Sequence, residues 1–97
     1  MADAHDRAAR RVAKILKGEY EPADSPDVRG AKGRAEVKSR AAEITKALRQ
    51  LGGGPDPAFI VLPKSEHQRA KVRLEGLKTG LMDYNGNIAK PSTRKRR

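Results

Sequence analysis

The longest unbroken apolar run in this chain is AFIVL at Ala58–Leu62, which lies between Pro57 and Pro63. A short, β-branched run between turn-forming residues is typical of a strand that is buried on both faces. Such a strand needs a cover on each side. The run therefore favours an α/β fold in which helices flank a small mixed β-sheet.

Three segments carry the apolar periodicity of helices that bury one face. They are Ala4–Lys17, Ser39–Leu51 and Ser65–Leu77. Gly18 stands where a residue in the left-handed conformation would end the first helix. Ser65 with Gln68 forms a capping-box pattern at the start of the third helix. These segments supply helices before and after the apolar strand.

Two further segments predict β-hairpins, Asp27–Lys38 and Gly80–Lys90. Gly30 and Gly33 bracket the turn of the first hairpin, and Asn85-Gly86 is a strong two-residue turn signal in the second. Glu19–Glu21 predicts a short edge strand. The expected order is α-β-β-β-α-β-α-β, and the last strand of this order belongs to the second hairpin.

The composition bounds the organisation and the partners of the chain. Its 97 residues fit one domain, and 22 Lys+Arg against 12 Asp+Glu give a net charge of +10. We assign residues 1–89 to a single domain and expect the basic tail 90–97 to be disordered. A basic surplus of this kind attracts polyanions such as DNA.

The same composition excludes several classes of protein. The absence of cysteine excludes disulfide frameworks and thiolate metal sites, and it fits a reducing, cytoplasmic compartment. No apolar run approaches the ~18 residues of a membrane span, so we expect no membrane association. Gly52–Gly54 lacks the Lys-Ser/Thr that completes a phosphate-binding loop, and we expect no small-molecule cofactor.

The first hairpin brings charged residues together. If Ala31-Lys32 forms its turn, Asp27 directly faces Glu36, and facing residues have Cβ atoms about 5 Å apart. Two carboxylates this close repel each other unless a cation lies between them, and Mg²⁺ binds one or two carboxylates together with phosphate and water. Lys38 lies two residues after Glu36 and points to the same face. Two carboxylates that bind a metal ion, with an ammonium group beside them, form a site that can hydrolyse phosphodiester bonds.

These residues also carry a family resemblance. Pro26-Asp27 followed by Glu36-Val37-Lys38 resembles the PD-(D/E)xK nuclease signature, and the chain is most similar to Holliday junction resolvases and small phage endonucleases of that superfamily. The resemblance implies a restriction-endonuclease-like core, Mg²⁺- or Mn²⁺-dependent cleavage of DNA, and a homodimer. It makes Asp27, Glu36 and Lys38 catalytic, with Asp27, Glu36 and a first-helix acid, here Asp6, binding the metal.

Basic residues outside this motif are candidates for contacts with the DNA backbone. They are Arg40, Lys64, Arg69, Lys71, Arg73, Arg94, Lys95, Arg96 and Arg97. Arg40 lies two residues after Lys38, the next four form the basic cluster of the third helix, and the last four belong to the tail.

A second interpretation stays open at this stage. Val37, Ala41, Ile44, Leu48 and Leu51 follow a heptad spacing, so 34–51 could form one continuous helix. On a helix, Glu36 and Lys38 would lie about 200° apart, and the site would not form. The chain would then be a non-catalytic, basic, helical nucleic-acid-binding protein.

Overall fold

The computed structural model of the chain describes residues 4–21 and 26–94. Within these residues the main elements are α1 (Ala4–Ile15), β1 (Gly18–Tyr20), β2 (Val28–Gly30), β3 (Gly33–Val37), α2 (Ile44–Leu51), β4 (Ala58–Val61), α3 (His67–Leu74), β5 (Gly80–Met82) and β6 (Ile88–Lys90). Short 3₁₀ helices, η1 (Ala41–Glu43) and η2 (Lys64–Glu66), precede α2 and α3. The expected α/β class is confirmed.

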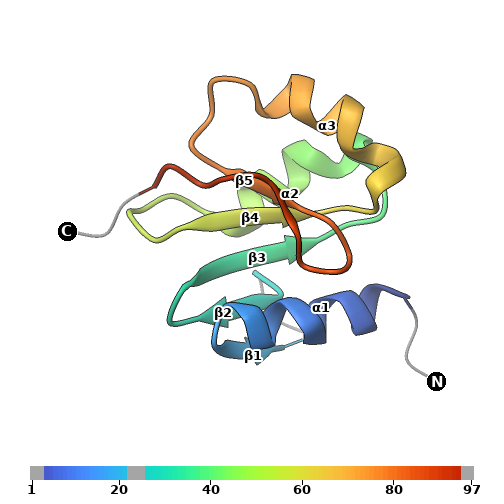
Figure 1. Cartoon of the computed structure of the whole chain (residues 1–97). Helices are drawn as coiled ribbons and strands as arrows, with labels where there is room; N and C mark the ends of the chain where they lie inside the picture. The colour runs from blue at the N-terminus through green and yellow to red at the C-terminus, as the bar shows by residue number, and fades with distance from the viewer. Residues whose placement is uncertain (1–3, 22–25, 95–97) are drawn as a thin grey trace.

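The described strands form one mixed sheet of six strands in the order β1-β2-β3-β4-β5-β6. β1, β2 and β3 run antiparallel to one another, β3, β4 and β5 run parallel, and β6 returns antiparallel to β5. α1 covers one face of this sheet, while α2 and α3 cover the other (Figure 1). No helix among the described residues is long and apolar enough to cross a membrane.

The central strand β4 is buried on both faces, as its apolar run predicts. Phe59 and Val61 pack into the cluster that contains Ala8, Ala9 and Val12 of α1. Ala58 and Ile60 belong to the second cluster, which α2 and α3 complete. Because successive side chains of a strand point to opposite faces, one short segment serves both cores.

The first hairpin has the predicted register. Val28 pairs with Ala35, and Gly30 pairs with Gly33, so the chain reverses at Ala31-Lys32. The turn lies close to the segment that leads into β4, because a Cβ on Gly33 would lie 2.7 Å from the carbonyl oxygen of Pro57. The alternative of a continuous helix over 34–51 is wrong, since this stretch begins as a strand of the sheet.

The helices are shorter than the apolar periodicity predicts. At the end of α1, Lys17 takes the left-handed conformation (φ 55°), and Gly18 instead begins β1. The second helix starts at Ile44 and not at Ser39, because Arg40 is extended and a 3₁₀ turn intervenes. The third helix begins on a 3₁₀ turn after Pro63, without a side-chain cap from the predicted capping box.

The chain after α3 also differs from the expectation. α3 ends at Leu74, and the expected last residue of its apolar stripe, Leu77, is 41% exposed. In the second hairpin the strands end at Met82 and restart at Ile88, so the connection is longer than two residues. Buried Asp83 organises this turn by accepting hydrogen bonds from the N–H groups of Asn85 and Asn87.

The expected tail is packed as far as Arg94. Lys90 is the last residue of β6, so the expected domain boundary falls inside a strand. Ser92 Oγ accepts a hydrogen bond from the N–H of Ala58 at 3.1 Å, and the N–H of Thr93 donates to the carbonyl of Lys78 at 2.9 Å. These contacts extend the fold beyond residue 89. The expected disorder of 95–97 falls outside the described residues.

Candidate active site

The two acids and the lysine of the PD-(D/E)xK pattern come together at one end of the first hairpin. Asp27 immediately precedes β2, Glu36 lies near the end of β3, and Lys38 immediately follows β3. In mixed and parallel sheets, ligands bind outside the carboxyl ends of the parallel strands, and β3 runs parallel to β4. The hairpin therefore places these side chains where α/β proteins build their sites.

Asp27 and Glu36 are tied together by crossed hydrogen bonds. The backbone N–H of Asp27 donates to Oε1 of Glu36 at 2.7 Å, and the N–H of Val37 donates to Oδ2 of Asp27 at 3.1 Å. Both acids are buried, at 8% and 1% exposure. Each carboxylate thus has one oxygen fixed by a backbone donor, and this fixes the orientation of both groups.

Lys38 pairs with the other oxygen of Glu36. Its Nζ lies 3.2 Å from Oε2 of Glu36, and its side chain is 12% exposed. The backbone of Lys38 is held on both sides, because its N–H donates to the carbonyl of Val61 at 2.9 Å and its carbonyl accepts the hydroxyl of Tyr84 at 2.8 Å. The ammonium is therefore presented from a fixed backbone position.

The surroundings of Glu36 favour the neutral form of its carboxyl group. Burial raises the pKa of its carboxyl, and the nearby negative charge of Asp27 raises it further. The hydrogen bond from the Asp27 N–H and the ammonium of Lys38 oppose this rise without cancelling it. A cation placed between the two carboxylates would counter these effects, because it favours the ionised form of both groups.

His5 is a member of this cluster that sequence reasoning missed. Its Nε2 lies 2.9 Å from the carbonyl oxygen of Val37 and 3.5 Å from Oδ2 of Asp27. The first turn of α1 brings it there, because α1 packs on the face of β3 that carries Val37. The available signal was its position beside Asp6 at the start of a helix that had to cover this face.

Asp6 is joined to the cluster through His5. Its Oδ1 accepts the hydroxyl hydrogen of Tyr20 and lies 3.8 Å from Nδ1 of His5. Among the described residues, no group of three or more His, Asp or Glu side chains is arranged to hold a metal ion. The role of Asp6 as a metal ligand therefore stays a prediction. Asp27 and Glu36, in contrast, lie next to each other.

The predicted DNA-contacting residues are spread over the surface. Arg40 is exposed just beyond Lys38, and Arg69, Lys71 and Arg73 are exposed on α3. Lys64 lies 4.0 Å from Oδ2 of buried Asp83. Arg94 donates to the carbonyl of Gly52 and to the hydroxyl of Thr79. The remaining tail residues, Lys95, Arg96 and Arg97, fall outside the described residues.

Comparisons with known proteins return no match: no family model, no curated protein and no solved structure is significantly similar to this chain.

Proposed function

We propose that this chain is a metal-dependent endonuclease that hydrolyses phosphodiester bonds of DNA. The observation that carries the proposal is the joining of Asp27 and Glu36 by crossed hydrogen bonds, with the ammonium of Lys38 at 3.2 Å from Glu36. Sequence spacing alone could match the PD-(D/E)xK pattern by chance. The side-chain cluster is what the chemistry of that pattern requires.

The arrangement of elements supports a restriction-endonuclease-like core. Along the chain, α1 is followed by the antiparallel strands β1, β2 and β3, then by α2 and the parallel strand β4. The acidic residues lie where β2 begins and where β3 ends, beside this parallel pair. A junction-resolvase-like preference for branched DNA and a homodimeric assembly are parts of the same proposal.

The donor set suits Mg²⁺, with Mn²⁺ as a substitute. Hard divalent cations of this kind bind through one or two carboxylates and fill their remaining positions with water and substrate phosphate. Asp27 and Glu36 supply two adjacent carboxylates, and a bound cation would counter the burial and the Asp27 charge that raise the pKa of Glu36. When bound there, the metal would stabilise the negative charge of the phosphate and acidify water.

The residues of the chain have distinct tasks in this proposal. Asp27 and Glu36 hold the metal, and the backbone donors of Asp27 and Val37 hold the two carboxylates in place. Lys38 has three N–H donors, so beyond its contact with Glu36 it can orient the attacking water and neutralise charge on the phosphate. His5 limits the rotation of the Asp27 side chain through its contact at 3.5 Å.

The experiment is a cleavage assay with Mg²⁺ or Mn²⁺ on linear duplex, single-stranded and four-way-junction DNA. We expect the wild-type chain to cleave at least one of these, and Asp27→Asn, Glu36→Gln and Lys38→Ala to remove cleavage while DNA binding persists. Lys32→Ala is the matched control, because Lys32 is an exposed lysine in the hairpin turn. Binding of DNA by the wild type without cleavage of any substrate would replace the proposal with a non-catalytic nucleic-acid-binding protein.

The place of action is also part of the proposal. A nuclease without cysteine needs no oxidising environment, and DNA is its substrate. We therefore place it in the cytoplasm.

A further inference from the structure

The exposed face of α1 carries a row of cations. Arg7, Arg10, Arg11 and Lys14 are all exposed and follow the spacing i, i+3, i+4, i+7, so they lie on one side of the helix. We call these four residues the α1 stripe. The opposite side of α1 is buried in the core through Ala8, Ala9, Val12 and Ala13.

The cations of the α1 stripe take part in no ion pair among the described residues. Asp6 is the one acid within α1, and it accepts a hydrogen bond from Tyr20. Among the ion pairs between described residues, none includes Arg7, Arg10 or Lys14. Arg11 differs from these three, because it donates to the carbonyl of Tyr84 and to Oδ1 of Asn85 and so holds the turn after β5.

The basic cluster of α3 has acids beside it as well. Lys64 lies 4.0 Å from the Asp83 carboxylate, and Glu66 and Glu75 stand at the two ends of the segment. Three exposed cations remain on the helix itself: Arg69, Lys71 and Arg73.

The α1 stripe also has acids nearby, namely Asp6 in its own helix and Glu19 and Glu21 beside it. It differs from α3 in arrangement, because its four cations share one side of the helix, whereas Lys71 lies about 200° around α3 from Arg69. A row of cations on one side attracts polyanions.

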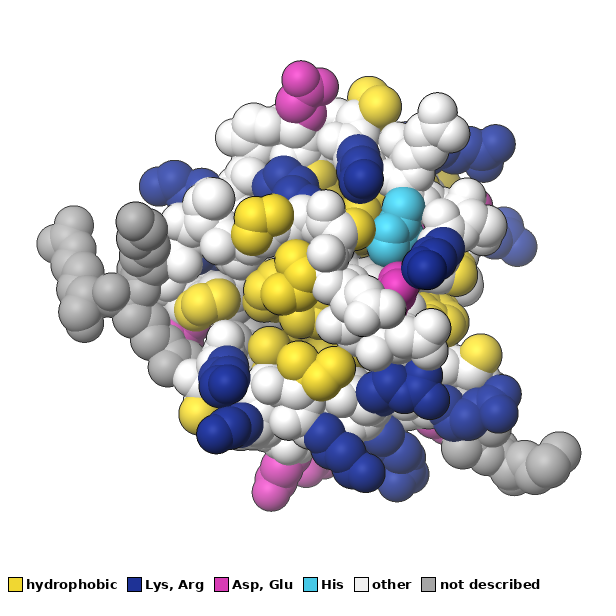
Figure 2. All heavy atoms as spheres, viewed as in Figure 1, with side chains coloured by type: hydrophobic (Ala, Val, Ile, Leu, Met, Phe, Trp, Pro, Cys, Tyr) yellow, Lys and Arg dark blue, Asp and Glu magenta, His cyan; other side chains and the backbone are white. Residues whose placement is uncertain are grey.

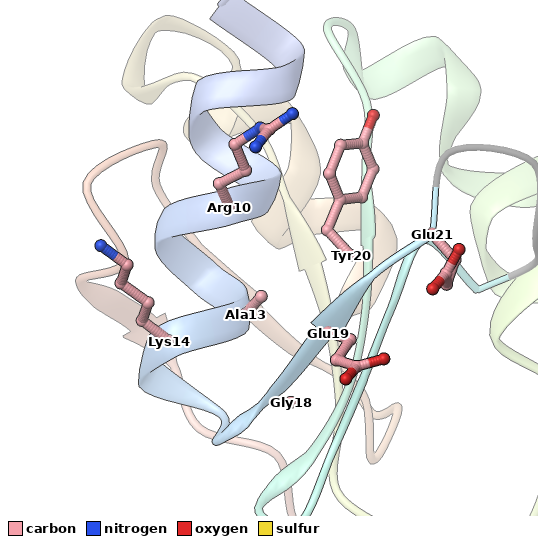
Figure 3. A pocket seen from close by; sticks show the side chains of 7 residues that line it. All are labelled: Arg10, Ala13, Lys14, Gly18, Glu19, Tyr20 and Glu21. Atoms are coloured by element: carbon pink, nitrogen blue, oxygen red, sulfur yellow. The ribbon is translucent and has the colours of Figure 1, made fainter.

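Figure 2 shows that Lys and Arg side chains gather on the part of the surface that α1 occupies in Figure 1. A shallow hollow beside the helix is lined by Arg10 and Lys14 on one wall and by Glu19, Tyr20 and Glu21 on the other. In Figure 3, Arg10 and Lys14 project from α1, while Glu19 and Glu21 extend from the far wall. These two acids bound the α1 stripe on the β1 side and repel a backbone that would lie across β1.

The length of the α1 stripe suits the phosphate spacing of duplex DNA. His5, on the first turn of α1, contacts Asp27 on the buried side of the helix, and the α1 stripe lies on the opposite side, since Arg7 is about 200° around the helix from His5. From Arg7 to Lys14 a helix rises about 10 Å, and over that axial length each strand of B-DNA presents about three phosphates. A duplex that lies along α1 can thus place about three phosphates of one strand against the α1 stripe.

We infer that the α1 stripe is the principal surface by which this chain binds the phosphate backbone of duplex DNA. It contributes more to this binding than the exposed cations of α3. This inference rests on the proposed function for DNA as the partner. A lipid surface is a poorer partner, because a helix that lies on a membrane needs an apolar face to insert, and the apolar face of α1 is buried in the core. The DNA backbone needs only cations at a suitable spacing.

The test measures binding of the full chain to a short labelled duplex in EDTA, by fluorescence anisotropy over a range of NaCl concentrations. The variant is the triple Arg7→Gln, Arg10→Gln, Lys14→Gln, which spares Arg11 because of its role in the turn. The matched control is the triple Arg69→Gln, Lys71→Gln, Arg73→Gln, which removes the same charge from α3. Thermal unfolding checks that each variant folds.

We expect the α1 triple to lose at least about tenfold in affinity at moderate salt, and the slope of log K against log[salt] to fall by about 2.7, since each phosphate contact contributes about 0.9. The α3 triple should lose clearly less in both quantities. An equal or larger loss in the α3 triple would overturn the inference. So would binding of the wild type to anionic vesicles without binding to the duplex.

This outcome is separate from that of the proposed function, because no cleavage occurs or is needed in EDTA. A chain that binds DNA through the α1 stripe but cleaves nothing would refute the nuclease and keep the inference. A chain that cleaves DNA but binds it equally well without the α1 stripe would support the nuclease and refute the inference.

Discussion

The backbone N–H of Asp27 donates a hydrogen bond to the side chain of Glu36 at 2.7 Å, so one acid of the candidate site holds the other through the main chain. The return bond runs from the N–H of Val37, the residue after Glu36, to Oδ2 of Asp27. Neither carboxylate can reorient without breaking a buried hydrogen bond, whose loss costs about 1–3 kcal/mol. The hairpin therefore supplies a preorganised pair of acids.

We predict that Glu36→Gln removes a component of the pH dependence of stability. Burial raises the pKa of Glu36 in the folded chain, so this residue stabilises the fold fully below its unfolded pKa, about 4.3, and loses that contribution as pH rises through the folded pKa. Urea unfolding of both proteins across this range should show the difference in unfolding free energy shifting in favour of Glu36→Gln as pH rises. A constant difference would refute the raised pKa.

We predict that Tyr84→Phe impairs catalysis by releasing the backbone of Lys38. The Tyr84 hydroxyl donates to the carbonyl of Lys38 at 2.8 Å, and such a bond contributes about 0.5–1.5 kcal/mol to stability. Because the ring remains, packing should be preserved, and kcat for DNA cleavage should fall several-fold with little change in KM. A control variant, Arg49→Gln on the exposed surface of α2, should leave both constants unchanged.

Much of the first hairpin was predictable, because a strand has a strict side-chain period of two and two turn glycines fix its register. Once Gly30 pairs with Gly33, Asp27 must lie opposite Glu36. The double burial of β4 was predictable for a similar local reason. Its apolar residues have no polar alternation, so both faces need a cover.

The contact of His5 was not predictable from the sequence, because it depends on how far α1 is rotated about its axis against the sheet. That rotation is set by the fit of small side chains, Ala8, Ala9 and Val12, against β3 and β4. The second hairpin deviates for another reason. Its Asn-Gly signal competes with Asp83, whose buried carboxylate captures the N–H groups of Asn85 and Asn87 and lengthens the turn.

We predict that His5 matters more than Asp6 for the geometry of the site. His5→Ala removes the bond to the Val37 carbonyl and the contact with Asp27, so kcat and the affinity for Mn²⁺, measured by electron paramagnetic resonance, should both fall. His5→Gln, which can still donate to that carbonyl, should restore part of both. Asp6→Asn should have the smaller effect on Mn²⁺ affinity, and a larger effect would show that Asp6 itself binds the metal.

We predict that Asp83→Ala destabilises the fold and changes its acid sensitivity. Burial tends to raise the pKa of Asp83, but the hydrogen bonds from Asn87 and Asn85 and the charge of Lys64 together lower it. Its contribution to stability is therefore present above the unfolded pKa, about 3.9, and is lost as pH falls through the lower folded value. At neutral pH the variant should lose about 1–3 kcal/mol in urea unfolding, and the loss should shrink in acid. A loss independent of pH would contradict this account.

The last prediction concerns the close approach of β1 to β2 at Gly18. A Cβ added to Gly18 would lie 2.0 Å from the carbonyl oxygen of Arg29 and 2.3 Å from Cα of Gly30, and both are backbone atoms of the paired strand β2. Gly18→Ala must therefore push β1 away from β2, and we expect a loss of more than about 2 kcal/mol in urea unfolding, because overpacking a rigid site costs about 1–3 kcal/mol or more. Gly53→Ala is the matched control, since a Cβ there meets no atom within 4 Å and its φ is not positive. It should be neutral or stabilise the chain by about 0.4–1 kcal/mol through the unfolded state. Equal effects of the two substitutions would show that β1 does not pair with β2 in this register.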